Sequence, residues 1–179
     1  MTKIQFFAGL ILITIISISS CQYADNSKGA VFNTTELAPA DKEEVKREIA
    51  GRIDEIIKGC KQLNIDTALN AYWDSPDFEI VSTDGSVINF QTMKNTAAAF
   101  FKSAKYVTYT TIKEDFKFLS KSLVMCTWIG REEDELKTGE HTKIDPYVGS
   151  MLFGKIDNEW KIVYVHESSA PAMKVDSAK

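Results

Sequence analysis

The chain has 179 residues, with 21 basic and 25 acidic side chains and a formal net charge of −4. An acidic chain without a lysine or arginine cluster excludes the electrostatic footprint of a nucleic-acid-binding protein and electrostatic docking on anionic lipid. It holds three cysteines and two histidines without Cys-x-x-Cys or His-x-x-x-His spacing. The sequence therefore gives no support for a metal site, and no cofactor is expected.

Residues 1–20 are predicted to be a signal peptide. Lys3 provides a short basic start, and the uncharged apolar run at 4–18 is too short to be a membrane-spanning helix. Ile18-Ser19-Ser20-Cys21 resembles the bacterial lipobox, which implies cleavage before Cys21 and attachment of lipid to its sulfur. We expect a lipid-anchored protein of the bacterial cell envelope, facing the periplasm or the exterior. The alternative is an ordinary signal peptide that ends near a cysteine.

The rest of the chain divides into three parts. Residues 21–40 hold the lipidated Cys21 and a polar stretch without periodicity, which is typical of a flexible tether. Residues 41–171 suit one domain with one core, and residues 172–179 suit a disordered polar tail. Inside the domain, Cys60 and Cys126 lie among apolar residues and are expected to be buried free thiols. Outside the cytoplasm a disulfide between them is the alternative.

The predicted elements place helices first and strands afterwards. Asp41 and Glu44 form a capping-box pattern ahead of an amphipathic helix of about 20 residues, and Asp66 can cap a short second helix that ends near Tyr72-Trp73. Asp84-Gly85 marks a hairpin. The remaining expectations are a third helix at 91–103, strands at 78–82, 106–119, 122–131, 147–156 and 160–168, and a solvated charged arm at 132–143 that contains His141. This order indicates an α+β fold with helices on one face of a curved sheet.

The last predicted strand carries the most informative pattern. At the two-residue period of a strand, one face holds Trp160, Ile162, Tyr164, His166 and Ser168. That face runs from apolar to polar along its length, as the wall of a half-apolar pocket does. Tyr106, Tyr109, Trp128 and Trp160 fit either a ligand cage or an ordinary aromatic core.

These elements and the motif Trp160-x-Ile162-Val163-x-x-His166-x-Ser168-x-Ala170-Pro171 resemble the SnoaL-like, nuclear transport factor 2-like superfamily. The resemblance covers roughly residues 44–171. It implies a cone in which a curved antiparallel sheet wraps around a long N-terminal helix and two shorter helices and encloses a pocket. It also implies a homodimer formed through the outer face of the sheet.

Carried over to this sequence, the resemblance puts His166 and Ser168 in the pocket. Alternation along the strands and place in the fold add seven expected lining residues: Tyr72, Trp73, Phe100, Tyr109, Trp128, Tyr147 and Tyr164. Relatives often carry an arginine on the penultimate strand, but Val148-Gly149-Ser150-Met151 offers none. An arginine-held carboxylate ligand therefore does not follow from the resemblance.

Three functions remain open. The first is binding of a small, mostly apolar molecule. The second is isomerase- or cyclase-type catalysis with His166 as acid or base, oriented by Asp77, Asp84 or Glu79; a buried, hydrogen-bonded histidine without a catalytic role is the alternative. The third is a dimeric envelope interaction module without a ligand.

Overall fold

The computed structural model describes residues 37–175. The predicted signal peptide, Cys21 and most of the predicted tether lie outside the described residues. Within residues 37–175, no helix combines the length and the apolarity needed to cross a bilayer.

The structure contains the three predicted helices in the predicted order, although their starts differ from the prediction. They are α1 (Pro39–Lys61), α2 (Ile65–Leu69) and α3 (Phe90–Ser103). Helix α1 begins at Pro39, and its N-cap Ala38 has no capping side chain. The predicted capping box is therefore wrong. Asp41 lies in the first turn, where its carboxylate interacts favourably with the helix dipole. Asn64, not Asp66, caps α2 by accepting from the backbone N–H of Thr67 at 3.0 Å.

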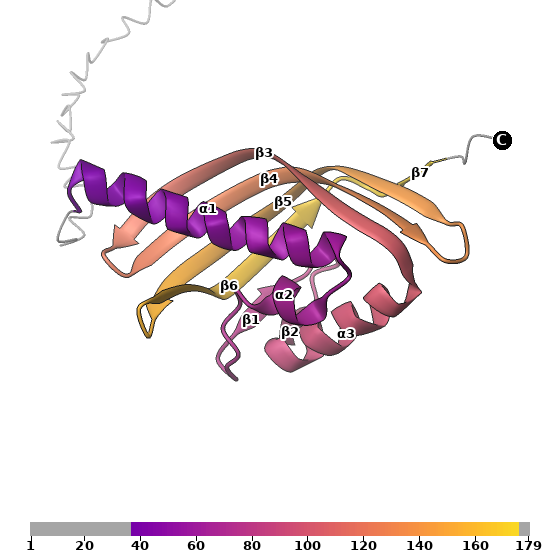
Figure 1. Cartoon of the computed structure of the whole chain (residues 1–179), viewed down its shortest axis with the longest axis horizontal. Helices are drawn as coiled ribbons and strands as arrows, with labels where there is room; N and C mark the ends of the chain where they lie inside the picture. The colour runs from indigo at the N-terminus through magenta and orange to yellow at the C-terminus, as the bar shows by residue number, and fades with distance from the viewer. Residues whose placement is uncertain (1–36, 176–179) are drawn as a thin grey trace, which may run out of the picture. The chain divides into compact units, whose positions relative to one another are not determined.

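The strands form one curved sheet in the order β2-β1-β6-β5-β4-β3, with β7 paired to β5. Figure 1 shows α1 lying across the concave side of this sheet, with α2, α3 and the short β1–β2 hairpin gathered near one end of α1. Every strand pairing is antiparallel except that of β1 with β6, which is parallel. The predicted α+β arrangement of a curved sheet around a long helix is confirmed. The strand bounds are β1 Glu79–Val81, β2 Val87–Asn89, β3 Ala104–Ser120, β4 Leu123–Leu136, β5 His141–Ile156, β6 Glu159–Ser169 and β7 Met173–Lys174.

Two stretches that were not predicted as strands belong to the sheet. The charged arm at 132–143 is the end of β4 and the start of β5, joined by a short turn around Gly139. Met173–Lys174 forms β7, so the prediction of a disordered tail is wrong at these two residues. The backbone N–H and C=O groups of a strand pair with the neighbouring strand whatever side chains the residues carry. A strand of polar residues is therefore not recognised from hydropathy.

The core lies between α1 and the concave face of the sheet. Its completely buried side chains include Ile49, Phe78, Phe153 and Ile162. Trp160 is also buried, and its indole N–H donates to the Glu48 carboxylate at 2.8 Å. The predicted free thiols are confirmed, because Cys60 and Cys126 are both buried and unbridged. Burial raises the pKa of each thiol to about 12, so both stay protonated at neutral pH.

Candidate functional site: a cavity between the sheet and the helices

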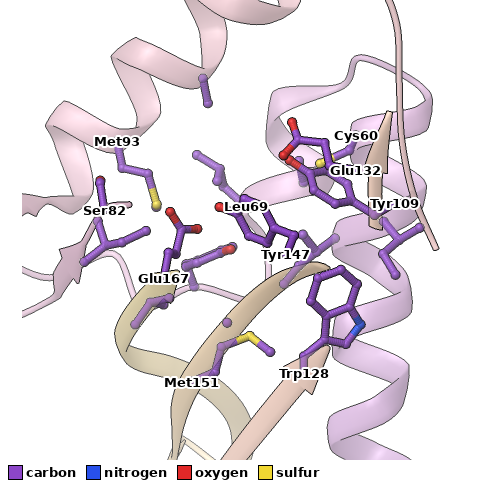
Figure 2. A pocket seen from close by; sticks show the side chains of 18 of the residues that line it. Cys60, Leu69, Ser82, Met93, Tyr109, Trp128, Glu132, Tyr147, Met151 and Glu167 are labelled. Carbon is purple, nitrogen blue, oxygen red and sulfur yellow. The ribbon is translucent and has the colours of Figure 1, made fainter. Parts of the chain in front are cut away.

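A cavity of about 480 Å³ opens between the concave face of the sheet and all three helices. Figure 2 shows its walls, with side chains from both the helices and the strands pointing toward a common centre. The volume suits a small organic molecule. Most of the lining is aliphatic, aromatic or sulfur-bearing, and its members include Ile53, Ile56, Ile57, Cys60, Leu69, Ile88, Met93, Phe100, Phe101, Met151 and Val165.

One wall of the cavity is aromatic. The rings of Tyr109, Trp128 and Tyr147 meet edge to face, with centroids 6.0 to 6.4 Å apart. The Trp128 indole N–H donates to the Thr111 hydroxyl at 3.0 Å, which fixes the direction of the ring. The indole lies over Gly130, where a Cβ atom would approach it to 2.2 Å. Gly130 is thus the residue that allows the indole to lie along the strand.

A β-bulge in β6 decides which side chains of that strand enter the cavity. Phe153 pairs with Ile162 and Leu152 pairs with Tyr164, so Val163 is an extra residue on β6. The alternation of inward-facing and outward-facing side chains along β6 therefore shifts by one residue at Val163. Ile162 faces inward before the bulge, whereas Val165 and Glu167 face inward after it.

The bulge overturns the predicted pocket face beyond Ile162. Tyr164, His166 and Ser168 lie on the opposite, outer face of the sheet, and His166 and Ser168 are exposed. Nothing in residues 37–175 pairs His166 with Asp77, Asp84 or Glu79 by a hydrogen bond or ion pair. His166 therefore has neither the position nor the orienting carboxylate that an acid/base role in this cavity requires.

Glu132 enters the cavity from β4. It continues the inward alternation of Val124, Cys126, Trp128 and Gly130, and it lies opposite Tyr109 of β3. The predicted solvated acidic run is thus divided between two faces, with Glu132 at the cavity. Buried Asp134 also points inward, where it accepts from the Thr142 hydroxyl.

The intervening carboxylates of this strand point outward and have basic partners. Glu133 contacts Lys143 at 2.8 Å and His141 at 3.0 Å, and Glu135 contacts Lys105 at 2.8 Å. His141 is therefore a partly buried strand residue and not the predicted solvated loop histidine. Tyr106, which also contacts His141 at 2.9 Å, belongs to this outer cluster and not to a ligand cage.

The two cavity carboxyls are difficult to ionise. Burial raises the pKa of Glu132 to about 7; a hydrogen bond from the Tyr109 hydroxyl opposes the rise, while the charges of Asp134 and Glu167 add to it. Burial also raises the pKa of Glu167, against a hydrogen bond from Tyr147. Because burial also raises the pKa of Tyr72, Tyr109 and Tyr147, these phenols stay neutral and can donate. The site thus offers two carboxyls and three phenol hydroxyls in a mostly apolar cavity.

The structure brings together five of the nine predicted lining residues: Tyr72, Phe100, Tyr109, Trp128 and Tyr147. Trp73 lines a separate groove with Asp74 and Lys161, and Tyr164, His166 and Ser168 lie on the outer face. Sequence reasoning missed Glu132 and Glu167. The inward alternation along β4 was a usable signal for Glu132. The inward position of Glu167 depends on a bulge that no residue type in β6 predicts.

Residues 37–175 contain no group of three or more His, Cys, Asp or Glu side chains that could hold a metal ion.

The chain is similar to a known domain family and to proteins of known structure. The model of the SnoaL-like domain family matches residues 49–173. No curated protein sequence matches the chain.

Solved structures with the same fold are numerous and distant in sequence. A candidate scytalone dehydratase from Novosphingobium aromaticivorans has a TM-score of 0.70 at 8% identity and covers 79% of this chain and 94% of its own. The hexachlorocyclohexane dehydrochlorinase LinA-type3 from Novosphingobium barchaimii has a TM-score of 0.65 at 12% identity, covering 79% and 97%. A nuclear transport factor 2-like protein from Salmonella enterica has a TM-score of 0.64 at 16% identity, covering 73% and 94%. At these identities the likeness establishes the fold and no more.

Proposed function

Because the chain belongs to the SnoaL-like domain family, whose fold serves both binding and catalysis, we propose that its cavity binds a small, mostly apolar molecule. The observation that carries the proposal is the cavity itself, about 480 Å³ with one aromatic wall and a few convergent polar groups. Specific small-molecule sites have this composition. A domain with a vestigial pocket would fill the space with side chains.

Gly149 provides the test of occupancy. It lies opposite Glu167 on β5, and a Cβ atom built there has only the Met151 Cγ within reach, at 3.9 Å. Gly149→Leu should therefore fill the cavity without disturbing the sheet. Native mass spectrometry of the protein purified from its own host should show a retained small molecule in the wild type and none in Gly149→Leu.

Ser150→Leu is the matched control, because it adds the same side chain to the neighbouring position on the outer face. This variant should keep the retained molecule. An empty wild-type protein would contradict the binding proposal and favour the interaction module. The measured mass also tests our proposal that the protein is a homodimer.

Catalysis of the isomerase or cyclase type is a second candidate, favoured by the raised pKa of Glu132. A carboxyl whose pKa is about 7 can donate or accept a proton at neutral pH, so Glu132, with Glu167 nearby, would take the acid/base role first considered for His166. The dehydrochlorinase and dehydratase names of two structural neighbours are in keeping with this candidate. Recovery of the retained molecule chemically unchanged after long incubation with the protein would exclude it.

We further propose that Cys21 anchors this domain to the bacterial envelope through lipid, with the domain facing the periplasm or the exterior. The support is the lipobox-like Ile18-Ser19-Ser20-Cys21 behind an apolar run. In cells fed a clickable fatty acid, the wild type should take up label and sediment with membranes. Cys21→Ser should lose both properties, whereas Cys60→Ser, a change at a buried thiol, should keep them. Unlabelled wild-type protein would refute the anchor.

A further inference from the structure

The two carboxyls of the cavity differ in their surroundings from the acidic side chains on the outside of the domain. Glu133, Glu135 and Glu159 each contact a lysine or arginine within 3.1 Å. Of the residues that line the cavity, all within the described chain, none is lysine, arginine or histidine. Phenol hydroxyls donate to both carboxyls, that of Tyr109 to Glu132 and that of Tyr147 to Glu167. A carboxylate removed from water requires a counter-charge or a proton.

The groups beside these carboxyls are suited to a positive charge. Tyr109, Trp128 and Tyr147 form the aromatic wall, and Tyr109 and Tyr147 are also the hydrogen-bond donors to the two carboxyls. The faces of such rings attract cations, and they do so most strongly where water is excluded. In Figure 2 Glu132 and Glu167 approach the cavity from opposite sides, with Tyr147 between them.

We propose that the ligand carries a protonated amine, held between Glu132 and Glu167 against the aromatic wall, with its apolar part among the helix residues. This inference rests on the proposed binding function and assigns the chemical class of its ligand. The ammonium N–H groups donate to the carboxylate oxygens, and the rings of Tyr109 and Tyr147 contact the adjacent carbons. The helix side of the cavity, formed by residues such as Ile56, Leu69 and Phe100, accommodates the hydrocarbon.

Binding of such a cation must be linked to pH. The titratable groups that face Glu132 are Cys60 on α1, Tyr109 on β3, Asp134 on its own strand, Tyr147 on β5 and Glu167 on β6. The thiol and the phenols remain neutral and do not respond in this range, whereas Glu132 does. With a pKa of about 7, Glu132 is largely protonated at pH 6, and the amine must displace that proton. Affinity should therefore rise about tenfold between pH 6 and pH 8.

Two probes of equal length separate the alternatives, 4-phenylbutylamine and the neutral 4-phenylbutan-1-ol. By titration calorimetry at pH 8, wild-type protein should bind the amine at least tenfold more tightly than the alcohol, with the pH dependence given above. Glu132→Gln and Glu167→Gln should each abolish most of this preference. Glu133→Gln, which changes the adjacent outward carboxylate, should leave it intact.

The outcomes distinguish this inference from the function on which it rests. An alcohol that binds as tightly as the amine would overturn the cationic ligand and leave the binding function in place. Binding of neither probe would overturn both. If the glutamine variants fail to fold, the preference of the wild type for the amine over the alcohol decides, because a cavity without a site for a cation would bind the two probes equally.

Discussion

Glu132→Gln is expected to make the ligand-free protein more stable at pH 8, by about 3 kcal/mol. Folding raises the pKa of this carboxyl from 4.5 to about 7, and each unit of pKa corresponds to about 1.4 kcal/mol. Below pH 4.5 the carboxyl is protonated in both states and costs nothing. As the pH rises toward 7, the unfolded chain ionises while the folded protein resists, so stability is lost across this window. Glutamine never ionises, and its oxygen can still accept from Tyr109.

Chemical denaturation of both proteins at pH 5 and pH 8 tests this expectation. The stability difference should be small at pH 5 and near its full value at pH 8. Glu133→Gln serves as the control because the neighbouring carboxyl has a lowered pKa, held down by Lys143, His141 and Tyr106. It should show no gain at pH 8. An equal stability of wild type and Glu132→Gln at pH 8 would mean that Glu132 is better solvated than its place in the cavity implies.

A stabilising substitution in the middle of a binding cavity has a particular meaning. Residues selected for stability alone do not place a poorly compensated carboxyl beside a second one. Functional sites often do retain such groups, at a cost in stability. A measured gain for Glu132→Gln would therefore support a functional role for the carboxyl pair that is independent of which ligand binds.

The same carboxyls show how far sequence reasoning reaches in this fold. The helices, the Asp84-Gly85 hairpin and the long strands follow from apolar periodicity and turn chemistry, and the structure has them in the predicted order. Alternation also placed Tyr109, Trp128 and Tyr147 at the cavity correctly. Local patterns suffice where a strand stays regular.

Sequence reasoning failed where regularity breaks. The bulge at Val163 exchanges the faces of all later residues of β6, so Glu167 replaces His166 at the cavity. A bulge depends on how β5 and β6 pair, which is a tertiary property. The end of β4 failed for another reason: a run of charges reads as solvated, although every second side chain of the strand faces inward.

A glycine in α1 should be the most sensitive backbone position near the cavity. Gly59 is buried where α1 meets α2, and a Cβ atom built there would lie 2.2 Å from the backbone nitrogen of Ala68 and 2.5 Å from its Cα. Backbone atoms cannot rotate away as a flexible side chain can. Gly59→Ala should therefore push α2 away from α1 and cost about 3 kcal/mol or more, despite the better helix propensity of alanine.

Gly51 is the matched control on the same helix. It is exposed, and a Cβ atom there meets nothing within 4 Å. Gly51→Ala should raise the unfolding free energy by up to about 1 kcal/mol through helix propensity alone. Thermal and denaturant unfolding of the two variants should thus move in opposite directions. Because Cys60, Ala68 and Leu69 line the cavity beside this helix contact, Gly59→Ala should also weaken ligand retention, whereas Gly51→Ala should not. If Gly59→Ala left the unfolding free energy unchanged, α2 would be free to shift away from α1. The shape of the cavity would then be determined by the sheet and α3 rather than by the close approach of the first two helices.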